Sequence, residues 1–109
     1  MVSLERWKTF DLRTQIGHIT SELSRAEHWQ KKHDDPARDE SLYRALELAD
    51  MTLNCCQGAR RREMARYREG IASFTSSRNE CEFSLDQLVQ YGLTVATTKP
   101  ETDRAIFCR

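Results

Sequence analysis

The sequence predicts an all-α protein: an antiparallel four-helix bundle with up-down topology and a short C-terminal tail. Three observations lead to this fold class. Apolar residues recur at alternating steps of three and four in several segments, which is the period of a helix with one buried face. The chain has only four glycines and two prolines, and no hairpin signal separates its apolar segments. We expect one domain over residues 1–98 and a tail over residues 99–109.

The first helix is expected from about Ser3 to Lys32, with a bend near Asp11. Its apolar stripe steps by 4, 3, 4 and 3 through Leu12, Ile16, Ile19, Leu23 and Ala26. Polar residues fill the other faces of this segment, so the helix is expected to bury one side only.

The second helix is expected from about Pro36 to Cys56, because Asp35 can cap it and Pro36 suits the first helical position. Its apolar face is wide, which is typical of a helix that touches two neighbours. That face consists of Leu42, Leu46, Leu48, Ala49, Met51, Leu53, Cys55 and Cys56.

The third helix is expected from about Ala59 to Phe74, after a very short turn. Gly58 suits the left-handed conformation that follows the end of a helix. Met64, Tyr67, Ile71 and Phe74 continue the helical period after it. Short connections of this kind join antiparallel neighbours in helix bundles.

The fourth helix is expected to follow a polar loop, Thr75–Glu82. Ser84 and Gln87 have the spacing of a capping box, which marks a helix start. We favour a helix that continues to about Thr98. The alternative ends the helix at Gly92 and leaves the β-branched segment Leu93–Thr98 extended.

The charge balance limits the classes of partner. Seventeen basic residues balance seventeen acidic ones. Zero net charge argues against a dedicated nucleic-acid or membrane-surface binder, and it lowers the repulsion between copies. We therefore expect a homo-oligomer or a protein partner, with nucleic acid disfavoured and no membrane contact.

The apolar segments also bear on location. No stretch approaches the ~18–20 apolar residues of a membrane span, and the first residues lack the apolar core of a signal peptide. We expect a cytoplasmic protein with reduced cysteines.

No metal site or cofactor is expected from the cysteines and histidines. Cys55 and Cys56 are adjacent and so point about 100° apart on a helix, and Cys81 and Cys108 complete no metal-ligand spacing. We interpret Cys55 and Cys56 as packing residues near a helix end. The three histidines, His18, His28 and His33, do not share one helix face.

Arg13 and His18 match the loose R-x₄₋₆-H pattern of HEPN-type helical RNases. Such a pair could polarise a phosphate and relay a proton during RNA cleavage. Two common residues at a tolerant spacing often arise by chance, so a HEPN-like RNase or a nucleotide- or RNA-binding helical bundle is kept as the alternative function. We assign no catalytic residue.

The arginine cluster Arg60, Arg61 and Arg62 is a candidate anion-binding site. These cations occupy the first turn of the expected third helix, where the helix dipole disfavours positive charge. A bound phosphate or carboxylate could compensate, because helix N-termini attract anions. The alternative is a solvated face with local ion pairs such as Glu63 with Arg66.

Charged ridges on three helices form a second candidate binding site. If the ridges face each other, they place a charged cluster between the helices, where buried charge must be paired. We interpret such a cluster as fixing the register between neighbouring helices rather than as a catalytic site. The ridge residues are Glu22, Arg25, Trp29, Arg44, Glu47, Asp50, Arg66 and Glu69.

Three segments resemble a group of small bacterial cytosolic proteins of unknown function. These segments are QIGHITSELSRAEHW (Gln15–Trp29), YRALELADMT (Tyr43–Thr52) and EMARYRE (Glu63–Glu69). The resemblance implies a compact helical domain with no settled activity. Together with the wide apolar face and zero net charge, it leads us to expect a non-enzymatic interaction or oligomerisation module.

Overall fold

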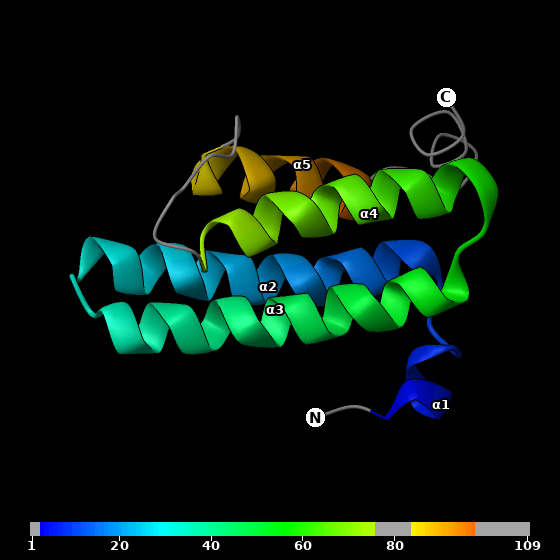
Figure 1. The fold of residues 1–109 in the computed structure, drawn as a ribbon, viewed down its shortest axis with the longest axis horizontal. Helices are drawn as coiled ribbons and strands as arrows, with labels where there is room; N and C mark the ends of the chain where they lie inside the picture. The colour runs from blue at the N-terminus through cyan, green and yellow to red at the C-terminus, as the bar shows by residue number, and fades with distance from the viewer. Residues whose placement is uncertain (1–2, 76–83, 98–109) are drawn as a thin grey trace.

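The computed structural model describes residues 3–75 and 84–97 of the chain, and these residues form five helices. The helices are α1 (Leu4–Trp7), α2 (Leu12–Lys31), α3 (Asp35–Cys55), α4 (Gly58–Ser73) and α5 (Leu85–Thr97). No strand occurs in this described part, so the all-α prediction is confirmed for it. Figure 1 shows α2 and α3 lying lengthwise side by side, with α4 and α5 along one side of this pair. The most extensive packing joins α2 to α3, followed by α2 to α5 and α3 to α4.

The expected first helix is two helices rather than one bent helix. Ser3 caps α1 by accepting a hydrogen bond from the Arg6 N–H at 3.2 Å. Asp11 caps α2 in the same way, with its carboxylate 2.8 Å from the Thr14 nitrogen. The predicted bend near Asp11 is therefore a complete break, because Asp11 itself adopts an extended backbone.

The start of α3 lies one residue earlier than expected. Asp34, not Asp35, is the cap, and its carboxylate accepts the Ala37 N–H at 3.1 Å. Asp35 and Pro36 then occupy the first turn of α3. His33 enters the turn with a φ of 58°, which lets α3 follow α2 almost at once.

Gly58 has the left-handed conformation predicted for it, with a φ of 60°. Its position in the fold differs from the prediction. The residues after α3, Cys56 and Gln57, are extended, so Gly58 begins α4 rather than ending α3. The turn between the two helices is as short as expected.

The capping box at the start of α5 is confirmed. The Ser84 N–H donates to Gln87 Oε1 at 2.7 Å, and the Gln87 N–H donates to Ser84 Oγ at 3.1 Å. The helix continues through Gly92 to Thr97, so the extended alternative for this segment is wrong up to that residue. Most of the expected loop Thr75–Glu82 and the tail of residues 99–109 lie outside the described residues, and the predicted domain boundary at residue 98 stays a prediction.

The core lies where α2 meets α3 and α5. Ile16, Ile19 and Leu23 from the predicted stripe of α2 are fully buried. Trp7 of α1 is also fully buried, and its Nε1–H donates to Thr52 Oγ1 of α3 at 3.0 Å. A four-residue helix is not stable alone. The burial of Trp7 and its hydrogen bond to Thr52 therefore help to attach α1 to the rest of the molecule.

No helix in the described part of the chain is long and apolar enough to cross a membrane.

Candidate functional site

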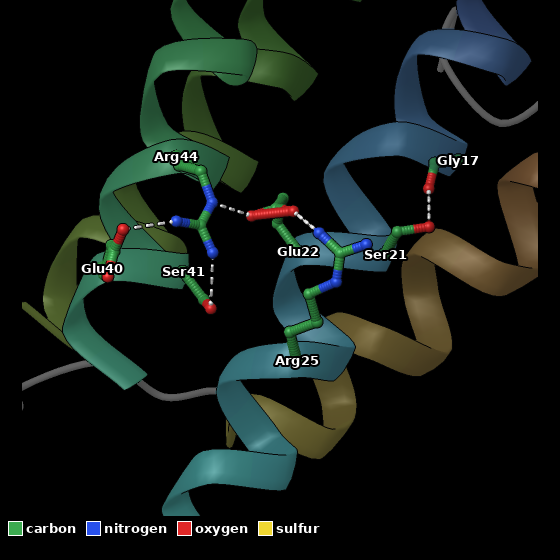
Figure 2. A network of polar contacts seen from close by, with 7 residues as sticks. All are labelled: Gly17, Ser21, Glu22, Arg25, Glu40, Ser41 and Arg44. Carbon is green, nitrogen blue, oxygen red and sulfur yellow. Dashed lines mark hydrogen bonds and ion pairs between the residues drawn. The ribbon is translucent and has the colours of Figure 1, made fainter. Parts of the chain in front are cut away.

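The most connected polar group in the fold is the carboxylate of Glu22, on the α2 face that meets α3. Glu22 is only 7 % exposed to solvent. Arg25 Nη1 donates to Glu22 Oε1, and Arg44 Nε of α3 donates to Glu22 Oε2 at 2.5 Å. Figure 2 shows the carboxylate lying between the two guanidinium groups. Both oxygens of this buried anion are thus paired, which makes its burial tolerable.

Arg44 links this carboxylate to the first half of α3. Its Nη1 donates to Glu40 at 2.9 Å, and its Nη2 donates to Ser41 Oγ at 3.2 Å. The hydrogen bond that Arg44 donates to Glu22 is the main cause that raises the pKa of Arg44 above its ordinary value. Every nitrogen of the Arg44 guanidinium is therefore used, and the group is held in one orientation.

A pocket of about 260 Å³ lies beside this network, lined by Trp7, His18, Arg25 and Arg44 among others. The Glu22 carboxylate at its wall already accepts from two cations, so it is poorly placed to act as a general base. The arrangement instead ties α2 to α3 at a fixed register. The predicted role of these residues in binding stays a prediction.

The remaining ridge residues do not join this cluster. Trp29 lies beyond it on α2, half-buried, with its ring 4.9 Å from the ring of His28. Glu47 is exposed, and Asp50 pairs with Arg68 of α4, a residue outside the predicted ridges. Two further ridge residues, Arg66 and Glu69, are exposed on α4. The sequence reasoning missed Glu40, although its spacing of four from Arg44 is a helical ion-pair signal.

Replacing Arg44 by alanine is expected to lower the free energy of unfolding by about 1 kcal/mol, because Glu22 would keep only one cationic partner. The effect is modest because the Arg44 side chain is 39 % exposed and solvent screens its ion pairs. Glu47→Ala on the same helix is the matched control, with an expected change within about 0.5 kcal/mol. Urea denaturation measures both values, and equal losses would contradict the assignment.

The arginine cluster at the start of α4 divides into three different environments. Arg61 Nη1 donates to the Leu53 carbonyl near the end of α3, where the helix dipole favours a cation. Arg60 is half-buried and lines a pocket, and Arg62 is exposed. The ion pair predicted between Glu63 and Arg66 is present at 3.8 Å. The three arginines are therefore not one site.

The adjacent cysteines also differ from each other. Cys56 is buried, as predicted, and burial raises the pKa of its thiol despite the opposing influence of Arg60 and Arg61. Cys55 is exposed, so its predicted packing role is wrong. Its thiol lies 3.3 Å from the Met51 carbonyl oxygen, one turn earlier on α3. Cys81 and Cys108 lie outside the described residues.

Arg13 and His18, the pair that suggested RNA cleavage, line the same shallow recess on α2. Arg13 lies 3.9 Å from Asp11, and the His18 ring stacks on Phe10 with 5.3 Å between centroids. Cleavage by this pair stays a prediction. Within residues 3–75 and 84–97, no three His, Cys, Asp or Glu side chains are grouped to hold a metal ion.

A pocket of about 360 Å³ lies between α4 and α5, and the sequence reasoning did not find it. Leu88 and the rings of Tyr67 and Tyr91 form its mostly apolar wall, while Glu63 and Arg66 flank it. Burial raises the pKa of Tyr91 to about 12, so the phenol stays protonated at neutral pH. Its buried hydroxyl has no hydrogen-bond partner among the described residues.

The fold and these sites define a class: an all-α protein in which an arginine-bound carboxylate joins the two longest helices, α2 and α3. Comparison of the chain with protein-family models, with curated proteins and with solved structures found no match. The function must therefore be argued from the geometry.

Proposed function

We propose that this protein is a non-enzymatic interaction module that self-associates through the face between α4 and α5. The observation that supports this most directly is the open, mostly apolar pocket there, flanked by one acid and one base. Apolar surface with a polar rim is the usual composition of a protein interface.

The charges on this face are self-complementary. In a twofold dimer the same patch of each copy faces the other, so residue i of one copy meets residue j of its partner and the reverse. Glu63 of one copy would then lie against Arg66 of the other, and two ion pairs would form across the axis.

The low packing between α4 and α5 supports the same proposal. These two helices pack against each other much less than α2 packs against α3 or α5. A second copy could cover the surface that the two helices leave open. Zero net charge imposes no general repulsion between copies.

We also propose that α2 to α5 form the antiparallel, up-down four-helix bundle expected from the sequence, with α1 as an added turn. The short connections between α2 and α3 and between α3 and α4 support this topology. A cytoplasmic location and membership of the bacterial group that the chain resembles are part of the same proposal.

Charge reversal on this face tests the proposal. Glu63→Arg and Arg66→Glu each place like charges opposite one another in a twofold dimer, and each is expected to weaken self-association about tenfold or more. An equimolar mixture of the two variants should associate again, because the positive face of the Glu63→Arg variant then meets the negative face of the Arg66→Glu variant. Sedimentation velocity at increasing protein concentration measures all three samples.

Glu69→Arg is the control for this test, since it makes the same charge change at an exposed site of α4 that does not line the pocket. It should leave the association constant unchanged. A wild-type chain that stays monomeric at high concentration would rule out self-association, and so would two variants that associate as wild type does.

A further inference from the structure

A second pocket, independent of the α4–α5 face, lies where the end of α1, the start of α2 and the α3–α4 turn meet. Figure 1 shows the start of α2 and the α3–α4 turn at the same end of the molecule. The pocket has a volume of about 400 Å³, and Lys8, Gln15, Cys55, Gln57 and Arg60 contribute to its lining. It therefore contains one of the three arginines of the predicted anion site, together with groups that the sequence does not connect to them.

Gln15 supplies the first indication of a ligand. This side chain is only 3 % exposed, and its Nε2 donates to the carbonyls of Trp7 at 3.0 Å and Phe10 at 3.1 Å. Two carbonyl acceptors require the NH₂ group on that side, so the orientation of the amide is settled. Oε1 is left without a hydrogen-bond partner among the described residues, in a side chain that lines the pocket. A buried acceptor of this kind is unfavourable until a donor reaches it.

The charges of the pocket supply the second indication. Lys8 and Arg60 line it, and no acidic residue within residues 3–75 and 84–97 does so. The Cys56 thiol, which also lines it, has a raised pKa and so adds no negative charge at neutral pH. Among the described residues, an anion entering the pocket would meet two cations and no carboxylate.

The start of α4 supplies the third indication. Gln57 is the N-cap residue and lines the pocket, but its side chain makes no capping hydrogen bond. The first N–H groups of a helix have no partner within the helix, and together with the dipole they attract anions. This 16-residue helix thus begins at the pocket, because its N-cap residue Gln57 and its first-turn residue Arg60 both line it.

We propose that this pocket binds a small phosphate monoester that carries a free hydroxyl group. The phosphate oxygens would accept hydrogen bonds from Lys8, Arg60 and the first-turn amides of α4. The hydroxyl would donate to Gln15 Oε1, which a fully deprotonated oxyanion alone would leave unpaired. A volume of about 400 Å³ leaves room for an organic portion beyond the phosphate.

Titration of ¹⁵N-labelled protein with glycerol 3-phosphate tests this ligand class. Saturable shifts are expected for the amides of Gly58, Ala59 and Arg60 and for the side-chain NH₂ of Gln15. Inorganic sulfate, which has no hydroxyl at neutral pH, should bind more weakly than glycerol 3-phosphate. Equal affinity for sulfate would overturn the role of Gln15, and binding to phosphatidate vesicles without a response to glycerol 3-phosphate would overturn a small soluble ligand.

Two matched variants separate a site from general attraction. Arg60→Gln should weaken the binding of glycerol 3-phosphate about tenfold, the loss of one charge-assisted hydrogen bond. Arg62→Gln removes the same charge from the same turn at an exposed position, and it should leave the affinity within about twofold, as screened charges outside a site do. Neither position is in the core, so both variants should keep the helical circular dichroism of the wild type. Equal losses for the two variants, or no saturable shift in the wild type, would overturn the proposal.

Discussion

Trp7→Ala is expected to lower the free energy of unfolding by about 3–5 kcal/mol, the range for truncating a large buried aromatic side chain. Trp7 is fully buried and packs edge-on against Phe10, with 5.8 Å between ring centroids. The substitution empties that volume and also removes the donor of the hydrogen bond to Thr52 Oγ1. Urea denaturation followed by far-ultraviolet circular dichroism measures the loss.

Trp7→Phe separates the two contributions, since it keeps an aromatic ring and removes only the N–H and part of the volume. Its expected loss is about 1–2 kcal/mol, mostly the broken hydrogen bond to Thr52. Trp29→Ala is a control at a half-buried site on α2 and should be less harmful than Trp7→Ala. A loss below about 1 kcal/mol for Trp7→Ala would mean that α1 is not docked in solution.

Gly92→Ala is expected to lower the free energy of unfolding by about 2 kcal/mol, although alanine is the better helix former by about 1 kcal/mol. The added Cβ would lie 1.9 Å from Thr20 Oγ1, 3.0 Å from the Tyr67 hydroxyl and 3.1 Å from Thr20 Cβ. Thr20 cannot yield easily, because it is buried and its hydroxyl donates to the Ile16 carbonyl at 2.7 Å. The two helices must therefore separate, and overpacking of this kind costs about 1–3 kcal/mol or more.

The double variant Gly92→Ala/Thr20→Ala tests whether this contact is the cause. Removing Oγ1 relieves the closest approach and leaves the contacts with Thr20 Cβ and the Tyr67 hydroxyl, so the double variant should lose at least ~1 kcal/mol less than the sum of the single variants. Additive losses, or a stabilised Gly92→Ala variant, would show that α5 does not approach α2 as closely as described.

The apolar spacing predicted which segments are helical, because one buried stripe per helix is a local property of the chain. The break at Asp11 could not be predicted in the same way. Whether a helix continues through Phe10 depends on what satisfies the carbonyls that the break exposes. Here the Gln15 amide reaches back to the carbonyls of Trp7 and Phe10, and Trp7 reaches Thr52 of α3. The second of these contacts spans much of the sequence and leaves no periodic signal.

The candidate sites also divide into contacts that local residue spacing predicts and contacts that depend on how distant helices pack. The pair of Glu22 with Arg25 follows from a spacing of three on one helix, whereas the approach of Arg44 depends on the register between α2 and α3. Asp50 pairs with Arg68 and does not join the network of Glu22 and Arg44, because α4 packs against the part of α3 that carries Asp50. The pocket between α4 and α5 depends on how closely two helices pack, which residue spacing does not report.

The close pairing of α2 with α3 also has a consequence for the rate at which the chain folds. These helices follow each other directly, so their contacts form after the closure of a very short loop. The helix α5, which packs on α2, is separated from it by the whole of α3 and α4, so its docking requires a larger loss of chain entropy. The α2–α3 hairpin is therefore expected to be present in the folding transition state, with α5 joining afterwards.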